Sequence, residues 1–420
     1  MKFRVYKRKI LILALVVCLL LLLIWNRLHW DTREVNTRFD AALMVEEKES
    51  GTPKSSQELE SLPYNNPLEL RNAVYQNNLQ LTVLNREKFH QQPELVLVVQ
   101  VQGGTSNLRI LIESLQQSPD IDRVLLIFSL EQLSHDITHL IQRVDFCQVL
   151  QIFFPYSLQL YPLEFPGQDP QDCPRDISKE EALKRRCKNA DYPDSFGHYR
   201  EAQFTQSKHH WAWKLHFVWD HVLVNTNYTG PVFFIEENNF LLPDFYHLSK
   251  LMTDLQKQKY PDCHILSLGS HEPAELDSDV ARKVDIMGWT ATKHKMGIGL
   301  SREVYNSIMQ CLSAFCTYDD YNWDWTVQHI SAQCLSRPLK VMVPRLARIY
   351  NIMDCGAKEC DLGTKEKNMR RVLESARRSL FPTSLSIGLS QIAVPQRPHT
   401  KNGGWGDVRD HSLCQSYSKL

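Results

Sequence analysis

The chain has 420 residues, of which 43% are hydrophobic and 23% are charged. This length suits one large domain or two to three smaller ones, and the composition excludes a disordered or fibrous protein. The 48 basic side chains are balanced by 48 acidic ones, so the net charge is zero. A nucleic-acid-binding protein would normally carry a basic excess, and we therefore expect no nucleic-acid partner.

An apolar segment close to the start of the chain predicts a membrane anchor. Residues 10–25 carry no charge, whereas residues 1–9 hold five basic side chains and no acid. As a helix the segment would extend about 24 Å, a little less than the ~30 Å of a hydrocarbon core. A cleaved signal peptide is the alternative, but residues 26–30 lack the small residues of a cleavage site. The basic flank predicts a type II membrane protein with a cytosolic tail, a single-pass anchor and a lumenal remainder.

Residues 26–90 predict a solvated stem between the anchor and a globular domain at 91–420. The stem range is polar and rich in residues that break regular structure, although residues 68–84 are compatible with a helix that docks on the domain. The lumenal topology also permits glycosylation of Asn227, which begins the sequon at residues 227–229.

Short apolar runs separated by helical patterns follow the stem. Strands are predicted at 95–99, 124–128, 149–154, 232–235 and 264–268, with helices at 108–115 and 204–224. Continuous apolar strands that alternate with helices indicate an α/β fold with a mostly parallel central sheet. In such sheets ligands bind where the strands end. From residue 345 onward the pattern predicts loops, including a glycine turn at 401–406.

The cysteines support an oxidising compartment. Cys18 lies in the apolar segment, and the other ten cysteines form an even set in the lumenal part. Cys173 with Cys187, and Cys355 with Cys360, are plausible local bridges. Sequence leaves the partners open for Cys147, Cys263, Cys311, Cys316, Cys334 and Cys414. Buried free thiols are the alternative, and they would suit a cytosolic protein better.

Three clusters of side chains could carry chemistry. Glu236-Glu237-Asn238 follows a predicted strand, where acids can hold a divalent metal, although such acids often form only a solvated turn. Residues 316–325 combine three acids with two Tyr and two Trp. Aromatic faces stack on sugar rings and a carboxylate can act as general base, so we favour this function over an aromatic core element. Residues 206–214 hold basic and histidine side chains that could either contact a diphosphate or merely cap a helix.

These motifs resemble the N-acetylglucosaminyltransferase II family, the alpha-1,6-mannosyl-glycoprotein 2-beta-N-acetylglucosaminyltransferases. The resemblance extends from Glu94 to Tyr417 and is most specific at residues 192–201, 318–326 and 401–407. The basic residues 3–9 resemble the family too, whereas the stem does not.

The resemblance implies a GT-A fold in the Golgi membrane and an inverting transfer. UDP-N-acetylglucosamine would be the donor, manganese the cofactor, and the 2-hydroxyl of the alpha-1,6-arm mannose of an N-glycan the acceptor. Asp324 would be the base, and Tyr321 and Trp323 would contact the acceptor. The positions implied for the donor are Gln100, Val101, Gln102, Gly103, Gly104, Glu131, Gln206, Ser207, Lys208, His209 and His210. A homodimer or a complex with other Golgi transferases is the expected assembly.

Several positions depart from the family pattern, and they cluster on the donor and metal side. The family has metal-ligating Asp and His where this chain has Asn238 and Asn351. At residues 100–104 the family sequence is Gln-Val-His-Asn-Arg, so its Arg stands where this chain has Gly104. The family also has an Asp at the position of Glu131 and an Arg at the position that aligns with Glu275. Neutral amides are weak ligands for a transition-type divalent cation. Losing the Arg removes a contact worth roughly 1.5–3 kcal/mol.

Two hypotheses follow. The first is an active transferase that holds a metal weakly through Glu236, Glu237 and Asn238, or uses none. The second is a catalytically impaired paralogue that acts as a glycan-binding module or as a partner of active transferases. The family resemblance favours the first hypothesis, whereas the donor-side substitutions favour the second.

Overall fold

The structure is a computed structural model that describes residues 66–270, 278–353, 360–391 and 401–419. The predicted tail, the anchor and most of the predicted stem lie outside these residues, as do Glu275 and Cys355. Among the described residues, no helix has both the length and the apolar character needed to cross a membrane.

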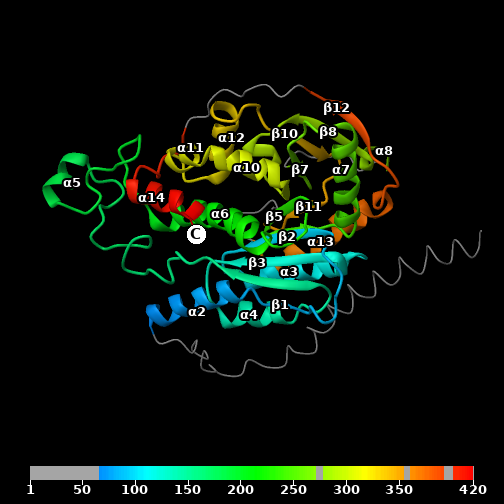
Figure 1. Cartoon of the computed structure of the whole chain (residues 1–420), viewed down its shortest axis with the longest axis horizontal. Helices are drawn as coiled ribbons and strands as arrows, with labels where there is room; N and C mark the ends of the chain where they lie inside the picture. Colours follow the sequence, from blue (N-terminus) through cyan, green and yellow to red (C-terminus); the bar gives the residue numbers. More distant parts are fainter. Residues whose placement is uncertain (1–65, 271–277, 354–359, 392–400, 420) are drawn as a thin grey trace, which may run out of the picture. The chain divides into compact units, whose positions relative to one another are not determined.

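A ten-stranded mixed sheet organises the described part of the chain (Figure 1). In their side-by-side order its strands are β1 (Val83–Leu84), β4 (Gln148–Phe153), β3 (Val124–Leu130), β2 (Leu95–Val101), β5 (Val232–Glu236), β9 (Ile298–Leu300), β7 (Ile265–Ser267), β10 (Lys340–Pro344), β8 (Lys283–Gly288) and β12 (Ser386–Ser390). Five of the nine neighbouring pairs in this described sheet are parallel and four are antiparallel. The predicted α/β fold is confirmed, and the sheet is mostly parallel by a small margin.

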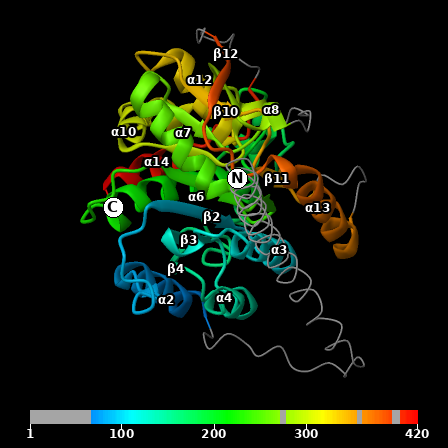
Figure 2. The same cartoon turned by 90° about the vertical axis from the view of Figure 1, so that its right-hand side faces the viewer.

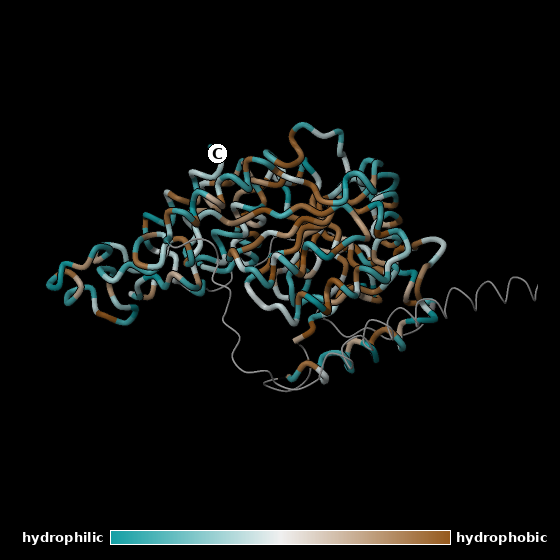
Figure 3. Tube along the Cα trace, turned by 90° about the horizontal axis from the view of Figure 1, so that it is seen from below, coloured by the Kyte–Doolittle hydropathy of each residue, from teal (hydrophilic) through white to brown (hydrophobic). Residues whose placement is uncertain are grey.

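Alternate residues of the central strands point to opposite faces of the sheet, as the pleat of a strand requires. Leu95, Leu97 and Val99 of β2 pack on one side with α3 (Thr105–Gln116), α4 (His135–Gln142) and α7 (Phe245–Lys259). Val96 and Val98 pack on the other side with α6 (Ala202–Phe217), α10 (Arg302–Gln310), α11 (Leu312–Thr317) and α12 (Trp323–Gln333). Figure 3 shows the hydrophobic strands enclosed between more polar helices. Strands covered on both faces must be apolar throughout, which explains the continuous runs in the sequence.

The last part of the chain corrects the prediction of loops after residue 345. The described residues there include the helices α13 (Leu362–Ala376) and α14 (Val408–Ser416), together with β11 (Ile349–Asn351) and β12. Only Met369, Leu373 and Ala376 of α13 are buried, so its apolar pattern is too sparse to indicate a helix from sequence. In Figure 1, α14 lies beside α6.

Part of the predicted stem range belongs with the sheet. The predicted helix there is α2 (Pro67–Gln80), which Asn66 caps by accepting the N–H of Glu69. The Asn78 side chain bonds both the N–H and the carbonyl of Phe153 at the end of β4. After α2 the chain adds β1 antiparallel to β4. Figure 2 shows α2 and α4 below β4.

Three cysteine pairs lie at disulfide distance in the described part of the chain. Their Cα–Cα separations are 5.3 Å for Cys173–Cys187, 6.0 Å for Cys311–Cys334 and 5.6 Å for Cys316–Cys414. The first pair closes the loop around α5 (Lys179–Arg185), which projects from the sheet in Figure 1. Cys147 and Cys263 are buried free thiols. The pairing of Cys355 with Cys360 stays a prediction because Cys355 lies outside the described residues.

Candidate active site

The carboxyl ends of three parallel strands bring the predicted donor-side residues together. β2 lies between β3 and β5, and the register aligns Gln100 of β2 with Ser129 of β3 and Glu236 of β5. The turns that follow these strands therefore meet at one edge of the sheet. Val101, the last residue of β2, is buried in the core and offers a ligand only its backbone.

Glu131, directly after β3, is the centre of a buried polar network. Gln206 Nε2 and His210 Nδ1, one turn apart on α6, each lie 2.9 Å from its carboxylate, and Gln100 Nε2 lies at 3.4 Å. Lys214 donates in turn to the side-chain oxygen of Gln100. Burial lowers the pKa of Lys214 to about 7 and also lowers the pKa of His210, although Glu131 opposes both shifts. This network places Gln100, Glu131, Gln206 and His210 in one cluster.

Lys208 and His209 sit on other sides of α6 and are not part of that cluster. Lys208 Nζ donates to the carbonyls of Tyr318 at 3.0 Å and Asp320 at 2.8 Å, and burial lowers its pKa to about 7. His209 Nε2 lies 2.9 Å from Asp410 Oδ1. Both side chains are fully enclosed, so in this arrangement they support other elements and have no open face for a donor. Ser207, between them and Gln206, is half-buried.

Glu237 directly follows β5, and its side chain reaches into the turn between β2 and α3. Its carboxylate accepts the backbone N–H groups of Gln102 at 3.0 Å, Gly103 at 3.2 Å and Gly104 at 3.2 Å. Burial raises the pKa of Glu237, and the three N–H donors act against that rise. Successive N–H groups of this kind form an anion-binding concavity. Here the protein's own carboxylate fills the turn at which the sequence predicts donor binding.

We expect Glu237→Ala to destabilise the protein by about 1–3 kcal/mol, because the three backbone N–H groups lose their acceptor. Glu236→Ala is the matched control, since Glu236 is exposed at the neighbouring position. Urea unfolding followed by circular dichroism measures both. Equal stability of the two variants would contradict the assigned role of Glu237.

The two amides at the family's metal positions lie close together. β6 (Asn239–Leu241) pairs antiparallel with β11, which aligns Asn351 with Asn239. The N–H of Ile352 donates to the carbonyl of Asn238 at 2.8 Å. The side-chain oxygen of Asn351 already accepts the N–H of Met353 at 2.9 Å. The fold thus brings the two predicted positions together, with amide side chains in both.

These residues fit a divalent transition metal poorly. Asn238 and Asn351 are neutral, and Glu237 already accepts three N–H groups. Of the four predicted metal ligands, Glu236, Glu237, Asn238 and Asn351, only Glu236 is a carboxylate that does not bond the turn at residues 102–104. Within the described ranges, no group of three or more His, Cys, Asp or Glu side chains could hold a metal ion. Oxygen ligands of low charge bind such ions weakly.

Two of the three acids in the block at 316–325 have structural roles. Asp319 accepts the N–H groups of Ser195 at 2.7 Å and Trp405 at 3.0 Å. Asp320 accepts the N–H groups of Asn322 at 2.9 Å and Asn402 at 3.1 Å. These bonds tie the block to the stretches around residues 195 and 402. Asp319 and Asp320 are therefore fully engaged as acceptors.

The glycine turn near the C-terminus packs against the ring of Tyr321. Gly403 and Gly404 have φ values of +78° and +76°, which L side chains rarely adopt. A Cβ on Gly404 would lie 2.9 Å from Tyr321 Cδ1, so the turn can pack against the ring only as glycine. Gly403 accepts the N–H of Tyr321 at 3.2 Å, and Gly404 donates to Asp194 at 2.7 Å. The motifs at 192–201, 318–326 and 401–407 thus form one structural unit.

Asp324 lies in the first turn of α12 and is only 5% exposed. Its Oδ1 accepts the N–H of Trp325 at 3.0 Å, and its Oδ2 lies 3.0 Å from Lys295 Nζ. Trp323 stacks on Trp211 of α6, with ring centroids 4.5 Å apart and an interplanar angle of 6°. Asp324, which the family resemblance implies to be the base, thus accepts one backbone N–H group, whereas Asp319 and Asp320 accept two each.

One pocket joins the donor side to the base side. Its lining includes Lys214, Glu236 and Asn351 from the donor side, and Lys295 and Trp323 from the base side. On the base side the pocket reaches Trp323, which precedes Asp324 in the chain, and Lys295, which pairs with Asp324. Sequence reasoning missed Lys295, because a lysine in a short loop carries no recognisable motif.

A second pocket lies beside Tyr321. Phe204 and Tyr321 form one aromatic wall, with ring centroids 5.6 Å apart, and Arg175, His198 and Glu201 add polar groups. Aromatic faces with hydrogen-bonding groups around them are suited to sugar rings. This pocket extends the predicted acceptor side away from Asp324.

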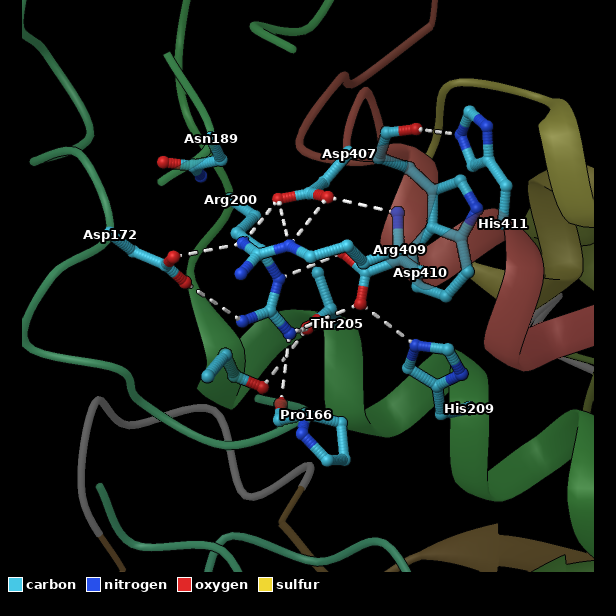
Figure 4. Close-up of polar contacts among 12 residues, drawn as sticks. Pro166, Asp172, Asn189, Arg200, Thr205, His209, Asp407, Arg409, Asp410 and His411 are labelled. Atoms are coloured by element: carbon cyan, nitrogen blue, oxygen red, sulfur yellow. Dashed lines mark hydrogen bonds and ion pairs between the residues drawn. The ribbon is translucent and has the colours of Figure 1, made fainter. Parts of the chain in front are cut away.

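A buried ion-pair network holds the projecting loop, α6 and α14 together (Figure 4). Arg200 Nε donates to Asp410 at 2.8 Å, and Arg200 Nη2 donates to the carbonyl of Pro166 at 2.9 Å and to the hydroxyl of Thr205 at 3.0 Å. His209 binds the same carboxylate. Burial raises the pKa of Asp410, but Arg200 and His209 outweigh burial and lower it to about 2. No local sequence signal links residues 200 and 410.

Comparison with known proteins identifies the family. The family model described as N-acetylglucosaminyltransferase II matches residues 71–414, more than half of the chain. The chain belongs to the N-acetylglucosaminyltransferase II family. Proteins named alpha-1,6-mannosyl-glycoprotein 2-beta-N-acetylglucosaminyltransferase are 44% identical in Sus scrofa and 45% identical in Mus musculus, each over the full length of both chains. The protein of that name in Arabidopsis thaliana is 28% identical and covers 78% of this chain and 75% of its own length.

A solved structure of the mannosyltransferase PcManGT from Pyrobaculum calidifontis, in complex with GDP-Man and Mn2+, aligns with 74% of this chain and 84% of its own. The identity is 9% and the TM-score is 0.29. The family assignment rests on the sequence matches. It agrees with the resemblance carried by the motifs around residues 195, 321 and 404.

Proposed function

We propose that this N-acetylglucosaminyltransferase II family member has a GT-A-type fold and transfers N-acetylglucosamine from UDP-N-acetylglucosamine to an N-glycan. The acceptor group is the 2-hydroxyl of the alpha-1,6-arm mannose. The observation that carries the proposal is the position of Asp324, whose buried carboxylate pairs with Lys295, a residue that lines the pocket between the strand ends and the aromatic block. Family membership supports the reaction type.

The transfer needs one base on the acceptor side. The acceptor hydroxyl oxygen attacks the anomeric carbon of the donor sugar, and its proton passes to the Asp324 carboxylate. The bond between that carbon and the phosphate oxygen breaks, and UDP leaves with the electron pair. Attack opposite the leaving group inverts the anomeric configuration. Trp323, held flat against Trp211, and Tyr321, held by the glycine turn, orient the acceptor sugar.

The donor side has to bind the nucleotide with little help from a metal. Glu236 is the charged ligand that this chain retains at the predicted metal position, and the amides of Asn238 and Asn351 add only weak donors. Manganese, the cofactor that the family resemblance implies, would therefore contribute less to donor binding here. The N–H groups of residues 102–104 already bond Glu237, and Gln206 already bonds Glu131, so a nucleotide that uses these groups would have to replace those contacts.

A transfer assay separates this proposal from the catalytically impaired alternative, which the substituted metal positions favour. Residues 60–420 would be incubated with UDP-N-acetylglucosamine, a biantennary acceptor and manganese, and the product analysed by mass spectrometry. Gain of one N-acetylhexosamine is the expected result. The double variant Asn238→Asp and Asn351→His is the comparison. Activity confined to that variant would contradict the proposal and support a glycan-binding role.

The setting of the domain follows from the sequence. We propose a single-pass type II protein of the Golgi membrane, anchored by residues 10–25, with a glycan at Asn227 and disulfide bonds in the lumenal domain. Asn227 is exposed in the loop before β5. The three cysteine pairs at disulfide distance support an oxidising compartment. A homodimer or a complex with other Golgi transferases is the assembly we propose.

A further inference from the structure

Lys295 comes from a segment that is separate in sequence from the base. It lies between α9 (Ala291–His294) and β9, and its Nζ is 3.0 Å from Asp324 Oδ2. The two side chains differ in environment, because that of Lys295 is 44% exposed whereas that of Asp324 is 7% exposed. The lysine thus reaches from the pocket wall to a carboxylate that solvent barely touches.

The loop that carries Lys295 is fixed on both sides. Ala291 N–H donates to the side-chain oxygen of Gln328 at 2.9 Å, and Gln328 lies one turn beyond Asp324 on α12. On the other side, Gly297 accepts the N–H of Leu268 at 3.0 Å. Gly297 has a φ of +61°, and a Cβ there would lie 2.9 Å from Leu268 Cβ. Hydrogen bonds therefore hold the backbone on each side of Lys295. On the Ala291 side the partner is α12, the helix that carries Asp324.

The ion pair and the backbone together fix both oxygens of the base. Oδ1 accepts the N–H of Trp325, and Oδ2 is paired with the Lys295 ammonium. A carboxylate has about four acceptor positions, so each oxygen keeps room for one more donor. A substrate hydroxyl can therefore approach a carboxylate whose orientation is already set. Preorganisation of this kind removes a cost that would otherwise fall on the reaction step.

We propose that Lys295 is the positioning residue for Asp324 in the transfer reaction. Its ammonium holds the carboxylate in one orientation through the ion pair, and it contacts neither the anomeric carbon nor the leaving group. During transfer the hydroxyl proton moves to Asp324 while Lys295 keeps its charge. This inference rests on the proposed function, because it assigns a role within the same reaction.

Steady-state kinetics of variants test the proposal. Lys295→Met is expected to lower kcat about 10- to 100-fold, since a loosely held base is misplaced in most encounters. The acceptor KM should stay within about twofold, because the lysine does not bind the acceptor. Lys295→Arg, which keeps the charge, should recover most of the lost rate. Lys257→Met, at an exposed position of α7, is the matched control and should behave as wild type.

A double-mutant cycle distinguishes positioning from a general structural effect. In an Asp324→Asn background, Lys295→Met should cause no further loss of kcat, because the group that it positions is gone. A further loss of the same size as in the wild-type background would overturn the proposal. An unchanged kcat for Lys295→Met alone, or a similar loss for the Arg variant, would overturn it as well.

Thermal unfolding is measured for the four proteins of the cycle: the wild type, Lys295→Met, Asp324→Asn and the double variant. It tests the inference separately from the proposed function. If the wild type transfers no sugar, the proposed function fails, and the pair is then judged by its effect on Tm. Coupled Tm shifts, smaller in the double variant than the sum of the single ones, would support the lysine as the residue that holds Asp324. Additive shifts would overturn it.

Discussion

Asp324→Asn is expected to lower kcat by about 10²- to 10⁴-fold, the range that a general base normally contributes. The amide has nearly the same shape as the carboxylate, but it cannot take the proton of the acceptor hydroxyl. The acceptor KM should change little, because Tyr321 and Trp323 provide the binding surface. Initial rates at varied acceptor concentration measure both parameters.

Asp320→Asn is an informative comparison within the same block. Asp320 is fully buried and accepts N–H groups from Asn322 and Asn402, so its loss should lower stability before it changes the chemical step. Asp254→Asn, at an exposed position of α7, should change neither. A kcat for Asp324→Asn within about threefold of the wild-type value would exclude Asp324 as the base.

Arg200→Met should cost about 3–5 kcal/mol of stability, because it leaves the buried Asp410 carboxylate without its main partner. The pKa of Asp410 is lowered to about 2 in the folded protein, below the ordinary value of 3.8. A lowered folded-state pKa gives stability that is present above about pH 4 and is lost as the pH falls toward 2. The difference between Arg200→Met and wild type should therefore shrink below pH 4.

Urea unfolding at pH 7 and at pH 3.5 measures this effect. Arg185→Met serves as the control, since Arg185 pairs with Glu181 on the exposed surface of α5 and such pairs contribute roughly 0–1 kcal/mol. If the two arginine variants were equally stable at pH 7, the network of Figure 4 would not be holding the projecting loop and α14 in place.

The central strands were predictable because each has a strong local signal, whereas the role of Asp324 as base is a prediction that the family resemblance implies. The runs at 95–99, 124–128 and 232–235 are apolar at every position, and β2, β3 and β5 occupy the buried centre of the sheet. Asp324 stands in a dense group of acids and aromatic residues. The structure adds that Asp319 and Asp320 each accept backbone N–H groups from other segments.

The remaining features depend on contacts between segments far apart in the chain. β8, β9 and β10 are short or only partly apolar, and they form because neighbouring strands complete their hydrogen bonds. Glu237 could be expected beside a metal from sequence, but its partners at 102–104 come from a different strand end. The same holds for Lys295, which meets Asp324 only through the packing of its loop on α12.

The transfer assay run without free metal tests the central claim most directly. Wild-type residues 60–420, UDP-N-acetylglucosamine and the biantennary acceptor would be incubated in parallel with manganese and with excess EDTA, and the acceptor mass followed over time. The account predicts gain of one N-acetylhexosamine under both conditions, with rates that differ by less than about tenfold, equivalent to 1.4 kcal/mol. An acceptor that stays unmodified in both reactions, or that is modified only with manganese, would contradict it.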